Sequence, residues 1–138
     1  MPFNYLFLQQ TFIMVKKNIF SIIVALIILY LSLADSQSFD KVPFLNIPHL
    51  DKIVHFLMYF GLMSVILFEH RKTINGKAQL FLIALIPLIY GILMEIMQVT
   101  ITSSRSGNIY DILANSTGIL VSAILWSLLS RRVINYFK

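Results

Sequence analysis

Four long apolar runs occupy most of this 138-residue chain and leave few folds open to it. Each run approaches the length of about 20 residues that a helix needs to cross the hydrocarbon layer of a membrane. A helix pairs its backbone groups internally in that layer, whereas an open sheet leaves its edges unsatisfied. The sequence therefore predicts an all-α fold, a transmembrane bundle of four helices at about residues 18–34, 53–69, 78–101 and 109–130.

The composition agrees with a membrane protein and argues against other classes. Charged residues make up only 12% of the chain, and 58% of it is hydrophobic, whereas a soluble domain is about 25% charged. The chain has no cysteine, which excludes a disulfide framework, a thiol nucleophile and a cysteine-based metal site. A net charge of +5 in such a protein reports orientation, so we expect no nucleic-acid partner.

The chain divides into residues 1–17, a cytoplasmic or interfacial N-terminal segment, and residues 18–138, the four-span membrane domain. Aromatic side chains in the first part suit a headgroup layer. Two alternatives stay open at this end of the chain. Residues 1–13 could be an upstream start artefact, and the first apolar run, preceded by Lys16-Lys17, could be a cleaved signal peptide rather than a retained helix.

The distribution of lysine and arginine predicts the orientation. With four crossings, eight of these residues share a side with both termini, and three lie on the other side. The first set is Lys16, Lys17, Arg71, Lys72, Lys77, Arg131, Arg132 and Lys138, and the second is Lys41, Lys52 and Arg105. Because the positive side faces the cytoplasm, we expect both termini inside and a multi-pass location in the bacterial cytoplasmic membrane.

Eight polar residues stand at or just inside the ends of the apolar runs. An ionisable group in lipid costs about 2.5–3.5 kcal/mol on insertion scales, so such groups pair, reach water or serve a function. In the predicted orientation all of them lie at the outer level of the membrane, on three helices and one loop. The eight are Asp51, Lys52, His55, Glu95, Gln98, Arg105, Asp111 and Asn115.

Their spacing divides them between helix packing and a site. Residues three or four apart share a helix face, and polar groups on such faces often only bond neighbouring helices, at about 0.6 kcal/mol each. We assign Asp51, Gln98, Asn115 and Gly118 to packing. The residues expected to bind a ligand are Lys52, His55, Glu95, Arg105 and Asp111.

The same residues form an ordered set of motifs. Asp51-Lys52-x-x-His55-Phe56, Glu95-x-x-Gln98, Arg105, and Asp111-x-x-x-Asn115-x-x-Gly118 follow one another in the chain. Their order and spacing resemble those of VanZ-like membrane proteins. The stretch before Arg105 lacks the Pro-Gly that often precedes this arginine in the family.

The resemblance implies a compartment and a process rather than a reaction. The family is named for a protein linked to resistance to the glycopeptide antibiotic teicoplanin. We therefore expect a protein of the cell envelope whose partners are membrane lipids and a lipid-linked cell-wall precursor or glycopeptide.

Three functions stay open on the chemistry of these residues. The first is a binding module for an anionic lipid head group or cell-wall precursor, in which Arg105 and Lys52 hold the anion. The second is an intramembrane enzyme for an envelope lipid or peptide, with His55, Glu95 and Asp111 as catalytic acid–base groups. The third is a structural or pore-forming protein. We expect no cofactor and no metal, since only His55 is a soft ligand and there is no H-E-x-x-H motif.

Overall fold

The computed structural model describes the backbone of residues 3–33, 49–101 and 108–136, and the side chains of residues 8–33, 49–101 and 108–129. These ranges include seven of the eight polar residues singled out in the sequence. Arg105 lies outside the described residues.

The described residues form five helices and no strand, which confirms the all-α prediction. The helices are α1 (Phe3–Lys17), α2 (Ile19–Leu33), α3 (Leu50–Glu69), α4 (Lys77–Ile101) and α5 (Ile109–Tyr136). The last four begin and end close to the helices predicted from the apolar runs, except that α5 continues further. The additional helix α1 falls in the segment for which no helix was predicted.

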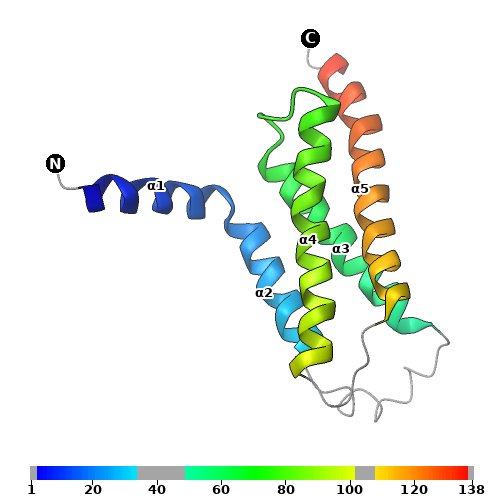
Figure 1. The fold of residues 1–138 in the computed structure, drawn as a ribbon. Helices are drawn as coiled ribbons and strands as arrows, with labels where there is room; N and C mark the ends of the chain where they lie inside the picture. The colour runs from blue at the N-terminus through cyan, green and yellow to red at the C-terminus, as the bar shows by residue number, and fades with distance from the viewer. Residues whose placement is uncertain (1–2, 34–48, 102–107, 137–138) are drawn as a thin grey trace.

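Three helices, α3, α4 and the Ile109–Leu129 part of α5, are each long and apolar enough to cross a membrane. Helix α2 has 15 residues and is about 22 Å long at 1.5 Å per residue, which is shorter than a hydrocarbon layer of about 30 Å. It joins the candidate spans only together with α1, from which it is bent by 76°. Figure 1 shows α1 pointing away from the other helices. A fourth crossing and the orientation of the termini therefore stay predictions.

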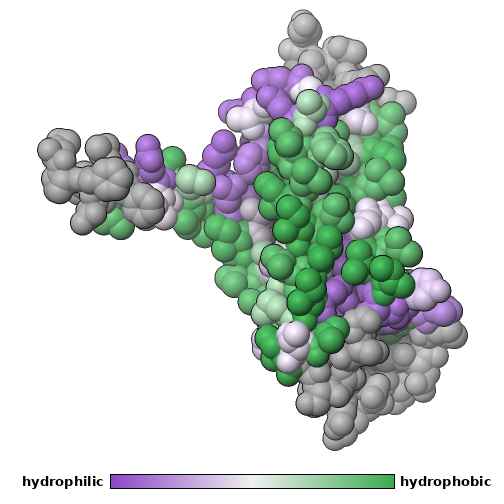
Figure 2. Space-filling view, in the orientation of Figure 1, coloured by the Kyte–Doolittle hydropathy of each residue, from purple (hydrophilic) through white to green (hydrophobic). Residues whose placement is uncertain are grey.

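Helices α2 to α5 lie side by side, and α3 supplies most of the core between them (Figure 1). The buried apolar residues are Ile28, Tyr59, Leu62, Met63, Ile66, Leu67 and Ile119. Apolar side chains also cover the outside of α4, where Phe81, Ile89 and Leu93 are exposed. Figure 2 shows this hydrophobic surface in the middle of the molecule with hydrophilic residues toward the ends, as a lipid environment favours.

Glycine sets how closely the helices approach. A Cβ atom at Gly118 of α5 would overlap the carbonyl oxygen of Phe56 and lie 2.9 Å from the backbone nitrogen of Phe60. Gly118 therefore allows α5 to contact the backbone of α3, as small residues do between membrane helices. Gly61, by contrast, has no atom of another helix within 4 Å of its Cβ position among the described residues, so it does not serve a close approach there.

Two contacts of α2 define the two ends of the molecule. The backbone N–H groups of Phe20 and Ser21 donate to the Glu69 carboxylate, with 2.8 Å between Phe20 N and Oε1. At the other end of α2, Gln98 Nε2 donates to the carbonyl oxygen of Ser32 at 3.0 Å. We call the end where α2 and α4 finish and α3 and α5 begin the site end. The end that holds Glu69 and the exposed residues Arg71, Lys72 and Lys77 is the basic end.

Candidate functional site

The site end is built from the first turns of two helices and the last turns of a third. Helix α5 begins at a local cap, because Asn108 Oδ1 accepts a hydrogen bond from Tyr110 N at 3.0 Å and its carbonyl accepts one from Asp111 N at 2.9 Å. Helix α3 follows His49, which has a φ of 63° and makes no side-chain cap. His55 and Asp111, in the first two turns of α3 and α5, lie close to Glu95 in the last two turns of α4.

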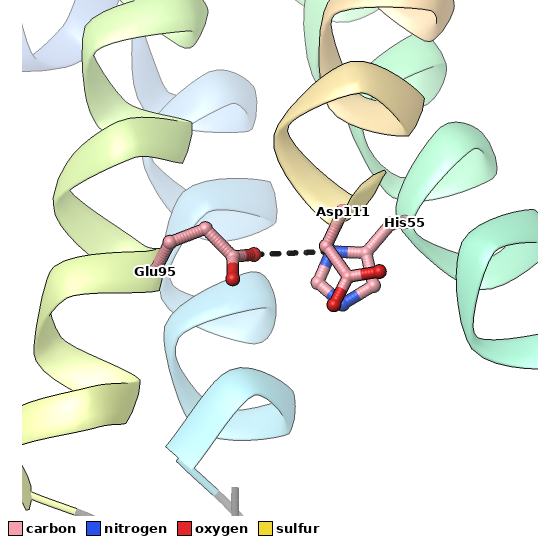
Figure 3. A group of neighbouring side chains, drawn as sticks. All are labelled: His55, Glu95 and Asp111. Carbon is pink, nitrogen blue, oxygen red and sulfur yellow. Dashed lines mark ion pairs between the residues drawn. The ribbon is translucent and has the colours of Figure 1, made fainter. Parts of the chain in front are cut away.

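Three side chains from three helices meet there. His55 of α3, Glu95 of α4 and Asp111 of α5 each place one nitrogen or oxygen atom within 4.8 Å of the other two (Figure 3). His55 Nδ1 lies 3.7 Å from Glu95 Oε1. All three residues are buried, with exposed fractions of 7%, 4% and 8%. We call these three residues the central cluster.

Asn115 contacts the central cluster directly. Its Oδ1 lies 3.1 Å from His55 Nδ1, and the residue is 2% exposed. The sequence analysis assigns Asn115 to helix packing and Asp111 to binding a ligand. In the structure the amide of Asn115, one turn along α5 from Asp111, is the side chain within hydrogen-bond distance of the imidazole.

Lys52 joins the central cluster to the surface. Its Nζ lies 3.2 Å from Asp111 Oδ1 and also pairs with Asp51. The Lys52 side chain is 27% exposed and that of Asp111 is 11% exposed, so the lysine extends from water to a largely buried carboxylate. Of the two carboxylates on α4 and α5, Asp111 is the one that holds Lys52, whereas Glu95 pairs with His55.

Gln98 lies at the rim of this arrangement. Its bond to the carbonyl of Ser32 ties α4 to the last turn of α2. Tyr90 makes a second link between these helices, with its hydroxyl donating to the Ala25 carbonyl at 2.6 Å.

The sequence analysis did not single out Tyr59. It lies one turn after His55 on α3 and is 1% exposed. Its hydroxyl has no hydrogen-bond partner among the described residues. The ring contacts the position where a Cβ of Gly91 would lie, at 3.0 Å, and Asn115 Nδ2 lies 3.3 Å from the same position. The i, i+4 spacing from His55 was the available signal for Tyr59.

The charges at the described site end are unbalanced toward the negative. Three acidic residues lie there, Asp51, Glu95 and Asp111, beside one described lysine, Lys52. A buried carboxylate is stable only when it is paired or ligated. Here His55 lies beside Glu95, and Lys52 pairs with Asp111. Chemically, the central cluster can transfer protons between His55 and Glu95 or bind a cation through one nitrogen and two carboxylates.

A large groove in the structure lies away from these residues. It has a volume of about 870 Å³, runs between α4 and α5, and reaches Arg71 and Lys77 at the basic end. None of the seven described candidates lines it. Its walls are mostly apolar, so size alone does not mark a site for charged ligands, and the concentration of buried polar groups marks the site end instead.

Comparison with known proteins identifies the family. The chain matches no curated protein and no solved structure at a significant level. It does match the VanZ/LLP1 family over residues 2–130. This range includes the first residue of each of the five helices and every motif of the site end. This match and the apolar helices establish a VanZ-like membrane protein, and the chain belongs to the VanZ/LLP1 family.

Proposed function

We propose that this protein binds an anionic head group at the outer face of the bacterial cytoplasmic membrane. The ligand would be the phosphate or diphosphate of a membrane lipid or of a lipid-linked cell-wall precursor, or a glycopeptide-related ligand. The observation that supports the proposal most is the convergence of His55, Glu95 and Asp111 from three helices, beside the half-exposed Lys52.

The depth of these residues fits a head group. Lys52 and Asp111 lie in the first turns of α3 and α5, and one helical turn spans about 5.4 Å. A ligand anchored in the membrane by its tails can therefore place its phosphate at this level without leaving the lipid. Lys52 supplies a cation for it, and Arg105 is the second cation that we expect from the family motif.

The competing explanation is that these groups only join helices. The Gln98–Ser32 bond and the Lys52–Asp111 pair are contacts of that kind. Helix packing alone, however, does not require an imidazole and two carboxylates to share one buried space, because each costs desolvation energy that a serine or an asparagine would avoid.

Direct binding tests the proposal. Purified protein in detergent would be titrated with a fluorescent polyprenyl diphosphate and, separately, with phosphatidylglycerol and with teicoplanin. We expect Lys52→Gln to weaken diphosphate binding about tenfold or more, because a charge-assisted contact contributes about 1.5–3 kcal/mol. The matched control is Lys77→Gln at the basic end, which should leave binding unchanged. Equal affinity of the wild type and Lys52→Gln would contradict the proposal.

An enzymatic function is a second candidate, favoured by one observation. The His55–Glu95 distance of 3.7 Å exceeds the hydrogen-bond reach of about 2.6–3.2 Å for general acid–base catalysis, but catalytic contacts without substrate are often long and tighten when substrate binds. The substrate would be an envelope lipid or peptide, with Asp111 as a further acid–base group. Product formation by the wild type that is lost in Glu95→Gln, with ligand binding retained, would place catalysis above binding alone. Absence of product across lipid and peptide substrates would exclude it.

A further inference from the structure

Three atoms of the central cluster have a geometry close to that of a cation site. Donor atoms bonded to one divalent cation at about 2.0–2.2 Å stand about 3–3.5 Å from one another. The His55 Nδ1–Glu95 Oε1 distance is 3.7 Å, and no pair among the three donor atoms of the cluster exceeds 4.8 Å. Side-chain movements of about 1 Å would bring the donor atoms to the separations expected around one bound ion.

Asn115 adds a fourth donor on the same side. Its Oδ1 lies 3.1 Å from His55 Nδ1, which is a typical separation of two ligands of one ion. The amide is 2% exposed, and its Nδ2 has no hydrogen-bond partner among the described residues. A buried amide whose oxygen lies against the imidazole of the central cluster, and whose nitrogen has no hydrogen-bond partner among the described residues, is placed for ligation rather than for a saturated hydrogen-bond network.

The charges lead to the same conclusion. Two carboxylates and a neutral imidazole offer a dianionic set of ligands to an ion that carries two positive charges. Lys52 Nζ lies 3.2 Å from Asp111 Oδ1, and one oxygen of the same carboxylate lies within 4.8 Å of the donor atoms of His55 and Glu95. One imidazole with oxygen ligands suits manganese or zinc better than copper or an all-oxygen calcium site.

We propose that His55, Glu95, Asp111 and Asn115 bind one divalent cation, Mn²⁺ or Zn²⁺, between α3, α4 and α5. This assignment departs from the sequence analysis, which expected no metal because no spacing motif is present. The ligands come from three separate helices, and no short motif encodes such a site. The inference rests on the geometry of the central cluster and does not require the proposed function. A bound cation would also add the positive charge that an anionic head group needs at this acidic end.

Cation binding by the full-length protein tests the proposal. The protein, purified in detergent and freed of metal with a chelator, would be titrated with Mn²⁺ and followed by the loss of the free-ion electron paramagnetic resonance signal. Zn²⁺ would be measured by elemental analysis after dialysis. We expect one ion per chain and a rise in the unfolding temperature when the ion is added.

Matched variants separate ligands from nearby acids. Glu95→Gln and His55→Gln should each weaken cation binding about tenfold or more, whereas Glu69→Gln at the basic end and the exposed Asp51→Asn should not. Asn115→Asp should strengthen binding, because a carboxylate replaces a neutral oxygen donor. Helix content and monodispersity in metal-free buffer show whether each variant folds, and the gain expected for Asn115→Asp cannot result from misfolding.

Two results would overturn the inference. One is a wild-type protein that retains no ion at micromolar Mn²⁺ or Zn²⁺, and the other is binding that is equal in the cluster variants and the controls. Head-group binding measured in the presence of chelator distinguishes the two proposals. If the head group binds in chelator and the metal titration shows no bound cation, the cation site is wrong and the proposed function stands. If the titration shows a bound cation and the head group binds neither with nor without chelator, the cation site stands and the proposed function is wrong.

Discussion

The two ends of the molecule differ in whether their charged side chains are exposed or buried. At the basic end, Arg71, Lys72 and Lys77 are exposed, and such charges cost little and mainly set orientation. At the site end, His55, Glu95 and Asp111 are buried and within 4.8 Å of one another. Position in the sequence does not distinguish these groups, since both stand at the ends of apolar runs. Burial distinguishes them, because membrane insertion alone explains the exposed charges of the basic end but not the buried ones of the site end.

The largest effect concerns which side of the membrane each end faces. The chain contains no cysteine, so single substitutions Asn75→Cys at the basic end and Asn108→Cys at the site end can be labelled without further changes. We expect an impermeant thiol reagent added outside intact cells to label Asn108→Cys and not Asn75→Cys. The opposite pattern would reverse the orientation and remove the basis for an outward-facing site.

The next effect concerns the contact between α3 and α5. Gly118→Ala places a methyl group against the backbone of α3. Overpacking of this kind typically costs about 1–3 kcal/mol, so we expect the free energy of unfolding to fall by about 3 kcal/mol. Gly61→Ala is the matched control, because nothing lies within 4 Å of that position. Thermal unfolding in detergent measures both. Equal stability of the two variants would show that α3 and α5 do not pack as described.

A smaller effect separates the lysines of the two ends. Lys52→Ala leaves the largely buried Asp111 carboxylate without its lysine partner, and we expect a loss of about 2 kcal/mol. Lys77→Ala removes an exposed lysine at the basic end and should change the free energy of unfolding by no more than about 0.5 kcal/mol. Chemical or thermal unfolding of the two variants provides the comparison. A loss of equal size would mean that burial does not distinguish the ends.

The smallest effect concerns two tyrosines of the core. Tyr90→Phe removes the 2.6 Å bond to the Ala25 carbonyl and should cost about 1 kcal/mol. Tyr59→Phe removes a buried hydroxyl that has no partner among the described residues and should be neutral or slightly stabilising. A clear destabilisation by Tyr59→Phe would reveal a contact of this hydroxyl at the site end that the described residues do not account for.

The sequence predicted the helices and the level of the polar residues better than their partners. Apolar runs and the cost of open backbone in lipid were enough to place α2 to α5 close to their observed bounds. Helix α1 was missed, because Gln9, Gln10 and Thr11 divide its apolar residues into two short runs. The shared depth of the polar residues in the membrane depends on the predicted orientation, and the packing role assigned to Gln98 stays a prediction.

Partners could not be predicted, since they depend on the rotation of each helix about its axis. The pairs Lys52–Asp111 and His55–Asn115 require the close approach that Gly118 allows, and spacing within one helix does not reveal it. For the same reason, spacing alone does not show that Gly118, and not Gly61, meets the backbone of a neighbouring helix among the described residues. The functional role of each site residue stays a prediction, and Arg105 lies outside the described residues.

The most direct test of a functional site at the site end is the unfolding temperature of the wild type and Glu95→Gln, each measured with and without a saturating polyprenyl diphosphate. If the central cluster is a ligand site, the variant folds, the ligand raises the unfolding temperature of the wild type, and Glu95→Gln changes the size of that rise because the carboxylate lies at the site. If the cluster only joins helices, Glu95→Gln changes the unfolding temperature without ligand. The ligand then produces no shift in the wild type or the same shift in both proteins, and that result would contradict the site.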